Sequence, residues 1–191
     1  MRARPISCCF SGHRPGKLPW GDDEGDRRCL ALKERLWNAM EAAYERGYRH
    51  FICGMAQGCD LYFCELALAL RQLHGDVTVE AAIPCPSQAE GWPAEQRLRW
   101  QRLVAACDYE TMVQERYTRD CMQRRNRYMV DRSDCVLAFW NGSRSGTGST
   151  VAYALATGRI VYCFDVHDLS VRTLEPEEQE DGQQTLERLS E

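Results

Sequence analysis

The chain has 191 residues, of which 44% are apolar and 27% are charged. This composition excludes a disordered or fibrous protein, and the length suits one globular domain with a hydrophobic core. The formal net charge is −4, from 24 basic and 28 acidic side chains. The net negative charge comes from the C-terminal end, because residues 172–191 carry seven acidic side chains and two arginines, whereas residues 1–171 carry 22 basic and 21 acidic side chains.

Short apolar runs alternate with longer stretches in which apolar side chains recur at helical spacing. The residues at the ends of these stretches agree with the pattern: Gly47 is typical of a helix stop, Asp60 is a candidate helix cap, and Pro93 suits a first helical turn. In chain order, the predicted elements are strand 6–10, helix 26–46, strand 51–53, helix 60–73, strand 77–83, helix 93–107, strand 109–113, helix 120–131, strand 135–139, helix 150–156 and strand 160–164.

Strands that are apolar along their whole length and alternate with helices indicate a parallel sheet covered on both faces. We therefore predict a three-layer, Rossmann-like α/β fold with a mostly parallel sheet, formed by residues 1–168 as one domain. Residues 169–191 are polar and acidic, and we expect a solvated, flexible tail there. A segment that binds a partner is the alternative interpretation of these residues.

The cysteines and the absence of long apolar runs bear on the cellular compartment. No apolar run approaches the roughly 20 residues that cross a bilayer, and no apolar segment follows the basic start of the chain. The odd count of eleven cysteines in a chain of this length favours reduced thiols. The four histidines lie far apart and no Cys-x-x-Cys pair occurs. We therefore expect a cytoplasmic protein without a membrane segment or a metal site.

Three loops that follow predicted strands contain the residues best suited to ligand binding. In an open α/β sheet, ligands bind outside the carboxyl ends of the strands. The first strand is followed by Ser11, Gly12, His13 and Arg14. The glycine allows the backbone to approach a ligand closely, and the histidine and arginine can contact anionic oxygen. A solvated surface turn explains the same four residues equally well.

The second loop contains Gly54, Ala56, Gln57, Gly58 and Asp60 and leads into an apolar helix. The free N–H groups and the positive dipole end of a helix start bind anions, and small residues allow a phosphate to come close. A tight turn with Asp60 as the helix cap is the alternative, and both interpretations can hold together. The loop is not a Walker loop, because no Lys-Ser or Lys-Thr pair follows its glycines.

The third loop follows the strand at 135–139 and is rich in glycine, serine and threonine. Its last residues are Gly146, Thr147, Gly148, Ser149 and Thr150, directly before a predicted helix. Such a loop offers many N–H and O–H donors with little steric bulk, which suits a phosphate or a ribose. A flexible linker is a poorer explanation, because linkers seldom join a buried strand to its crossover helix.

A basic stretch at residues 123–131 precedes the strand at 135–139. A solvated helix face is the usual explanation of such a charge run. Apolar side chains alternate with its arginines, however, so that Arg124 or Arg125 would face the cleft if the helix packs against the sheet. We include Arg125 and the neighbouring Asn126 among the candidate ligand-binding residues.

Together these segments resemble the SLOG superfamily, the Rossmann-like group that includes the Lonely-guy phosphoribohydrolases, the DNA-processing protein A family and the YpsA-like proteins. The pattern Gly54-x-Ala56-x-Gly58-x-Asp60 looks like a loop of the DNA-processing proteins. The segment 11–14 and the stretch from Arg125-Asn126 through Met129-Val130-Asp131-x-Ser133-Asp134 look YpsA-like, and the YpsA-like family is the best match. The resemblance spans residues 6 to about 166.

The resemblance implies a nucleotide pocket that holds ADP-ribose, an NAD-like molecule or a nucleoside phosphate, with no further cofactor. Within the superfamily such a pocket serves as a sensor or regulatory module, or as a site that cleaves an N-glycosidic bond. The hydrolase branch carries Met-x-x-Arg-Lys-x-x-Met, which Met122-x-x-Arg125-Asn126-x-x-Met129 matches except at Asn126. It also carries Pro-Gly-Gly-x-Gly-Thr-x-x-Glu, but Val151, Ala152 and Tyr153 stand here where the hydrolases place the acid. No catalytic residue is therefore assigned.

We expect a nucleotide-binding protein whose partner is a small molecule, with a phosphoribohydrolase and single-stranded DNA binding as the alternatives. We do not expect nucleic acid as a partner, because the near-neutral body and acidic end lack a basic surface. Trp20, Trp92 and Trp140 lie in or beside loops, where they either stack on a base or cover the core. The sequence leaves open whether the chain forms a homo-oligomer.

Overall fold

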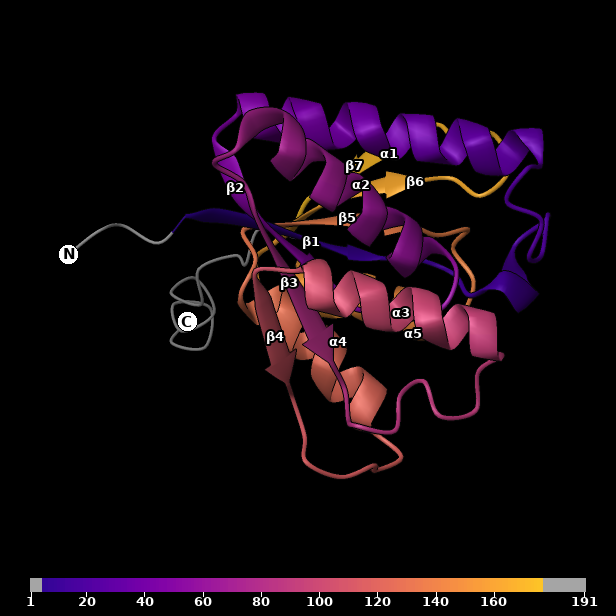
Figure 1. The fold of residues 1–191 in the computed structure, drawn as a ribbon. Helices are drawn as coiled ribbons and strands as arrows, with labels where there is room; N and C mark the ends of the chain where they lie inside the picture. The colour runs from indigo at the N-terminus through magenta and orange to yellow at the C-terminus, as the bar shows by residue number, and fades with distance from the viewer. Residues whose placement is uncertain (1–4, 177–191) are drawn as a thin grey trace, which may run out of the picture.

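A central sheet of seven strands, with helices on both faces, is formed by residues 5–176, the part of the chain that the computed structural model describes (Figure 1). The strands are β1 (Ile6–Ser11), β2 (Tyr48–Cys53), β3 (Thr78–Ile83), β4 (Tyr109–Met112), β5 (Cys135–Phe139), β6 (Ile160–Phe164) and β7 (Val171–Leu174). The helices are α1 (Arg27–Glu45), α2 (Cys59–His74), α3 (Ala94–Ala106), α4 (Cys121–Asp131) and α5 (Gly146–Ala156), and a short 3-10 turn, η1 (Pro15–Lys17), follows β1. The predicted α/β fold class is confirmed.

The strand order is β4-β3-β2-β1-β5-β6-β7, and every neighbouring pair is parallel except β6 and β7. The chain moves outward from β1 to β4 and then returns to place β5 on the other side of β1. The loops that leave β1 and β5 therefore diverge at the carboxyl edge of the sheet. Crevices at such a switch point are where open α/β sheets bind ligands.

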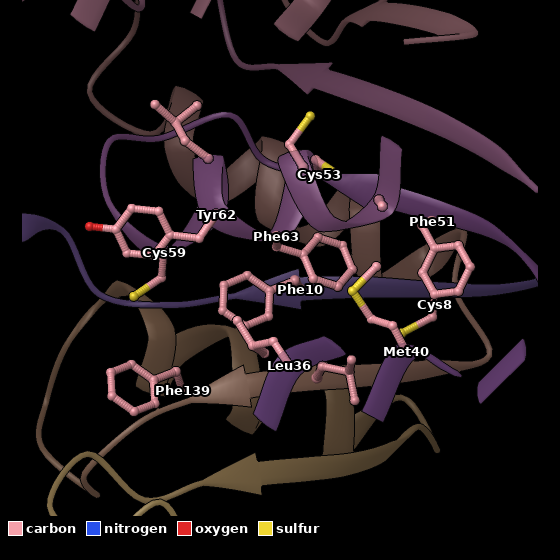
Figure 2. Close-up of a cluster of buried hydrophobic side chains, with 14 of the residues drawn as sticks. Cys8, Phe10, Leu36, Met40, Phe51, Cys53, Cys59, Tyr62, Phe63 and Phe139 are labelled. Carbon is pink, nitrogen blue, oxygen red and sulfur yellow. The ribbon is translucent and has the colours of Figure 1, made fainter. Parts of the chain in front are cut away.

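Side chains alternate along the central strands between two cores. Phe10 and Phe51 belong to the core under α1, α2 and α3, and Phe10 stacks on Phe63 of α2 with 4.9 Å between ring centroids (Figure 2). Cys9 and Val136 face the other way, into the core under α4 and α5. Figure 1 shows α1 and α2 above the sheet and α4 below it. The parallel central strands are buried on both faces, which explains their continuous apolar sequences.

The start of α2 differs from the prediction. Gly58, rather than Asp60, is the residue that precedes the helix, and Asp60 lies in its first turn. Gly58 has φ of 83°, and a Cβ there would lie 2.9 Å from the backbone oxygen of His13. Only glycine therefore allows the β1 loop to lie against the start of α2. The interpretation of Asp60 as a helix cap is wrong.

Helix α5 begins four residues earlier than predicted, at Gly146 rather than Thr150. The Ser145 side chain caps it by accepting a hydrogen bond from the Gly148 N–H at 3.0 Å. The glycine- and serine-rich composition of residues 146–149 predicts a loop, because these residues are weak helix formers. The cap at Ser145 and the burial of Thr147 favour a helix instead.

The expected tail contains a seventh strand. Residues 171–174 form β7, which pairs antiparallel with β6 at the edge of the sheet. The domain therefore extends beyond the expected boundary at residue 168 and includes β7. The rest of the expected tail, residues 177–191, lies outside the described residues. Among the residues that the structure describes, no helix has the length and apolar character needed to span a membrane.

The loop between β1 and α1 is fixed by a cluster of charges on three helices. Glu24 in this loop accepts hydrogen bonds from Arg99 of α3 and from Lys33 of α1, the latter at 2.6 Å. Arg99 also pairs with Glu65 of α2 at 2.7 Å. Because charges in a network restrain one another, this cluster fixes the far end of the loop that begins at Ser11.

A buried carboxylate fixes α4 against the sheet. Glu80 of β3, which is 7% exposed, accepts hydrogen bonds from Tyr128 of α4 at 2.6 Å and from Thr111 of β4 at 2.7 Å. His50 Nε2 of β2 lies 2.9 Å from its other oxygen. Burial by itself would raise the pKa of the Glu80 carboxyl, but hydrogen bonds from these partners outweigh burial and lower the pKa to about 2.

We expect Glu80→Gln to lower the free energy of unfolding at pH 7 by about 1–3 kcal/mol, because Tyr128 and Thr111 lose a charged acceptor. A carboxyl whose pKa is lowered in the folded state stabilises the protein above its unfolded pKa, and this contribution disappears as the pH falls toward 2. Urea unfolding should therefore show a difference between variant and wild type that is full at pH 7 and shrinks below about pH 4.5. An equal difference at pH 7 and pH 3 would contradict this assignment.

Candidate functional site

A cavity of about 460 Å³ opens at the carboxyl edge of the sheet, where the loops after β1 and β5 diverge. Its volume lies within the range of roughly 300–1,000 Å³ that small-molecule sites occupy. Loop residues after β1 and β2 and residues of α4 and α5 contribute to its wall. The lining residues are Ser11, Gly12, His13, Arg14, Gly16, Lys17, Ala56, Asp60, Met122, Arg125, Asn126, Ser145, Gly146 and Thr147.

The fold brings together ten of the sixteen residues that the sequence indicated as ligand-binding, and it does so at the carboxyl ends of the strands, as expected. The six that do not line the cavity are Gly54, Gln57, Gly58, Gly148, Ser149 and Thr150. Of these, Ser149 and Thr150 border a separate hollow of about 180 Å³ between α4 and α5. The ligand-binding role of all sixteen residues stays a prediction.

Four lining residues were missed: Gly16, Lys17, Met122 and Ser145. Met122 is the first residue of the pattern Met122-x-x-Arg125 and lies one turn of α4 before the arginine, so the spacing could have indicated it. Ser145 has the residue type of a helix cap directly before glycines. Gly16 and Lys17 form part of η1, and although Pro15-Gly16 is a turn signal, the sequence does not indicate that this turn borders the cavity.

Asp60 and Arg125 form an ion pair inside the cavity wall. They come from α2 and α4, and they are 6% and 3% exposed. The Arg125 Nη1 and Asp60 Oδ2 atoms lie 3.9 Å apart, which is too far for a hydrogen bond. Burial raises the pKa of Asp60, and the nearby guanidinium opposes that shift. Burial likewise lowers the pKa of Arg125, and the carboxylate opposes it. Two charges buried in this way are typical of a functional site.

Arg125 is held by its Nε atom and leaves part of its guanidinium unused. Its Nε donates to Asn126 Oδ1 at 2.8 Å, and Asn126 Nδ2 donates to Thr150 Oγ1 of α5 at 2.9 Å. Within the described residues, Arg125 Nη1 is buried and has no hydrogen-bond partner. An arginine can only donate, so this atom is suited to an oxygen acceptor from a ligand.

The loop after β2 leaves room for this ion pair because residue 54 is glycine. A Cβ at Gly54 would lie 2.5 Å from Arg125 Nη1 and 2.7 Å from Asp60 Oδ2. The carbonyl oxygens of Gly54 and Met55 accept hydrogen bonds from the Gln88 side chain at 3.2 and 3.0 Å. Gly54 is therefore part of the site without lining the cavity.

Two helix N-termini lie at this edge of the sheet. In the first turn of α2, Asp60 Oδ2 accepts a hydrogen bond at 3.2 Å from the N–H of Ala56, which lies in the preceding loop. At α5, the Thr147 hydroxyl donates to the Gly12 carbonyl at 3.1 Å and joins the β1 loop to the helix. Gly146 and Thr147 occupy the first turn of α5, where N–H groups have no partner within the helix itself. These donors favour an anion in the cavity.

His13 is 3% exposed and lines the cavity. Its backbone oxygen accepts a hydrogen bond from the Cys59 N–H at 3.3 Å, and its ring lies edge-on to Phe139 with 6.3 Å between ring centroids. Burial is the largest influence on the pKa of His13 and lowers it, and Lys17 lowers it further. The imidazole is therefore neutral at pH 7.

None of the three candidate tryptophans lines the cavity. Trp20 is buried beside Phe139, Trp92 packs edge-on against Trp100, and Trp140 Nε1 donates to the Ser143 carbonyl at 2.7 Å. The interpretation as core and loop packing is thus the better one. Across residues 5–176, no group of three histidine, cysteine or acidic side chains is arranged to hold a metal ion.

The chain is similar to a known protein family over most of its length. Residues 8–160 match the family model of YpsA, described as the YspA SLOG family. The uncharacterized SPbeta prophage-derived protein YoqJ of Bacillus subtilis is 31% identical over 142 residues, which cover 67% of this chain and 82% of YoqJ. The UPF0398 protein YpsA of the same organism is 22% identical over 172 residues, which cover 85% of this chain and 93% of YpsA.

Two solved structures have a similar fold. DNA processing protein A from Helicobacter pylori, whose structure is described by its unique single-stranded DNA binding mode, matches with a TM-score of 0.55 and 16% identity. DNA processing protein A from Streptococcus pneumoniae matches with a TM-score of 0.54 and 16% identity. Each match covers 83% of this chain but only 65% and 50% of the respective neighbour. At this identity the likeness shows a shared fold.

We expect Asp60→Asn to lower the free energy of unfolding by about 3–5 kcal/mol, because it leaves the Arg125 cation buried without a counter-charge. The same change should allow inorganic phosphate to raise the melting temperature more in the variant than in wild type, since an added anion restores the balance of charge. Urea unfolding and thermal melting with and without phosphate measure both effects.

Asp131→Asn is the matched control. Asp131 is an exposed carboxylate at the end of α4 that accepts a hydrogen bond from Tyr153. Its loss should change stability by no more than about 0.5 kcal/mol and leave the phosphate effect unaltered. If Asp60→Asn is as stable as the control, Asp60 does not stabilise the buried Arg125 cation, and the prediction is wrong.

Proposed function

The chain belongs to the YspA SLOG family, and we propose that it binds a nucleotide derivative in the cavity between β1 and β5. The observation that carries the proposal is the buried Arg125, which lines the cavity at the switch point of the sheet and whose Nη1 has no hydrogen-bond partner among residues 5–176. The ligand class is ADP-ribose, an NAD-like molecule or a nucleoside phosphate, and the protein acts as a sensor or regulatory module.

The charges around the cavity support an anionic ligand. Arg14 and Lys17 line its mouth from the β1 loop, and Arg125 lies deeper. The first turn of α5, with Gly146 and Thr147, adds N–H donors and the positive end of a helix dipole. A phosphate group satisfies arginine, lysine and N–H donors at once, because each of its oxygens accepts several hydrogen bonds.

The small number of acidic side chains around the cavity favours binding over hydrolysis. Cleavage of an N-glycosidic bond requires a carboxylate for the developing positive charge and a proton donor for the leaving base. Among residues 5–176, Asp60 is the only acidic side chain that lines the cavity, and Arg125 and the Ala56 N–H already engage it. A phosphoribohydrolase remains the enzymatic alternative, and release of free base from a nucleoside monophosphate is its direct assay.

The state of the thiols supports a reducing compartment. All eleven cysteines are free, and all but Cys107 are buried. Buried thiols without disulfides suit the cytoplasm, where we place this function.

We expect Gly146→Asp to weaken nucleotide binding by about tenfold or more, because it puts a carboxylate beside the ligand phosphate. A Cβ at Gly146 has no neighbouring atom within 4 Å, and an acid in the first turn suits a helix, so the fold should be unaffected. Calorimetry and thermal shift with AMP, ADP, ATP, NAD and ADP-ribose measure the effect.

Gly146→Asn is the matched control, since it adds the same bulk without charge. It should bind within about threefold of wild type, because threefold in affinity is well under 1 kcal/mol. Gly148 is a poorer position for this test, because a Cβ there would lie 2.9 Å from the Ser143 carbonyl oxygen. No saturable binding of any of the five nucleotides to folded wild type would overturn the proposal.

Single-stranded DNA is the second candidate ligand. The net charge of the sequence argued against nucleic acid as a partner. The likeness to DNA processing protein A from Helicobacter pylori, whose structure is described by its single-stranded DNA binding mode, supports nucleic acid as a candidate. Exposed arginines lie near the cavity: Arg14 lines its mouth, and Arg124 and Arg127 lie on the outer side of α4. Such a surface can follow a phosphate backbone.

The two candidates differ in their dependence on salt and on these arginines. For DNA binding, affinity for a dT20 oligonucleotide should fall steeply between 50 and 200 mM salt and fall again in the double variant Arg124→Ala, Arg127→Ala. Fluorescence anisotropy measures this. A nucleotide-binding protein gives no oligonucleotide binding at 50 mM salt and keeps its nucleotide affinity in the double variant.

A further inference from the structure

Two buried polar atoms in the cavity wall differ in what they require from a ligand. Arg125 Nη1 and His13 Nε2 are both buried without a hydrogen-bond partner among residues 5–176. A buried polar atom without a partner is destabilising, so a ligand that pairs both atoms gains affinity from each. Arg125 is always a donor and needs an acceptor from the ligand. The requirement of His13 depends on which ring nitrogen carries the proton.

The partners of the His13 ring indicate that nitrogen. Asn141 favours the protonated form of the imidazole and raises the pKa of His13 against the effect of burial, as an amide oxygen beside a ring nitrogen does. Because Nε2 has no partner among residues 5–176, Nδ1 is the nitrogen that suits a proton directed at this amide. A neutral imidazole has one N–H, and with Nδ1 as the donor, Nε2 is an acceptor.

The ring is also fixed in place, so that Nε2 has a defined position in the cavity wall. The backbone of the β1 loop is joined to α2 by the hydrogen bond from Cys59 to His13 and to α5 by that from Thr147 to Gly12. The edge contact with Phe139 restrains the ring itself. An acceptor at a fixed position selects for a ligand donor at the matching position.

We infer that His13 Nε2 accepts a hydrogen bond from a hydroxyl group of the ligand, and that the ligand is a ribonucleotide whose phosphate contacts Arg125. This inference rests on the proposed nucleotide function and adds the sugar to it. A ribose phosphate presents both required groups in one small molecule: anionic oxygen for the guanidinium and a hydroxyl donor for the imidazole. A deoxyribose lacks one of its hydroxyls.

Asp60 also lines the cavity, but its Oδ2 atom is already engaged. That oxygen accepts a hydrogen bond from the Ala56 N–H at 3.2 Å and lies 3.9 Å from Arg125 Nη1. His13 Nε2, in contrast, is buried without a partner among residues 5–176. The role assigned to it is recognition of the sugar, with no step of bond cleavage.

Calorimetric titration with AMP, 2′-deoxy-AMP and 3′-deoxy-AMP tests the inference. Wild type should bind AMP and lose about tenfold in affinity for the deoxynucleotide that lacks the contacted hydroxyl, since one hydrogen bond to a fixed partner contributes about 1.4 kcal/mol. His13→Phe should bind AMP about tenfold more weakly and bind that deoxynucleotide equally well. His13→Gln, which keeps an acceptor, should retain part of the discrimination.

His74→Phe is the matched control, because His74 is another histidine with an unpartnered Nε2, stacked on Tyr44 far along α2 from the cavity. It should bind all three nucleotides as wild type does. Circular dichroism and melting temperature verify that each variant folds, and only the ratio of the AMP and deoxy-AMP affinities decides the result.

The outcomes separate this inference from the proposed function. If no nucleotide binds, both fail. If ADP-ribose binds but AMP does not, or if AMP and both deoxynucleotides bind wild type equally, the inference fails and the proposed function stands. If His13→Phe weakens AMP and the deoxynucleotides by the same factor, His13 has only a structural role and the inference is overturned.

Discussion

The candidate site depends on one buried ion pair, that of Asp60 with Arg125. The two residues belong to helices on opposite faces of the sheet, so they can approach each other only beyond the end of the strands. Neither charge would be stable there without the other, because an isolated ion is strongly disfavoured away from water. Gly54 provides the space between them. The pair therefore fixes how the two faces of the domain meet and places a cation in the cavity wall.

The remaining polar groups of the cavity are arranged around that cation. Asn126 accepts a hydrogen bond from Arg125 Nε and connects it to Thr150, and Nη1 of the same guanidinium has no partner among residues 5–176. The helix start at α5 adds donors on one side, and His13 adds an acceptor. Donors for an anion beside a buried acceptor for a hydroxyl are the features of a site for a phosphorylated sugar. With Asp60 engaged in the ion pair, the same arrangement offers little for hydrolysis.

Much of this organisation follows from the sequence, and the exceptions have physical reasons. The apolar runs at 135–139 and 160–164 predict β5 and β6 at their observed bounds, because strands buried on both faces need apolar side chains throughout. Strand β7 is mostly exposed, and its polar sequence lacks that signal. The three loops were found because each follows a strand. The Asp60–Arg125 pair was not, since 65 positions separate the two residues and only the sheet order brings them together.

The central claim is that Arg125 binds the phosphate of a nucleotide at the switch point of the sheet. A crystal structure of the protein with ADP-ribose at saturating concentration tests it most directly. The account predicts a phosphate oxygen about 3 Å from Arg125 Nη1 and close to the first turn of α5. An ordered ADP-ribose elsewhere on the protein, or one in the cavity with its phosphates turned away from Arg125, would contradict it.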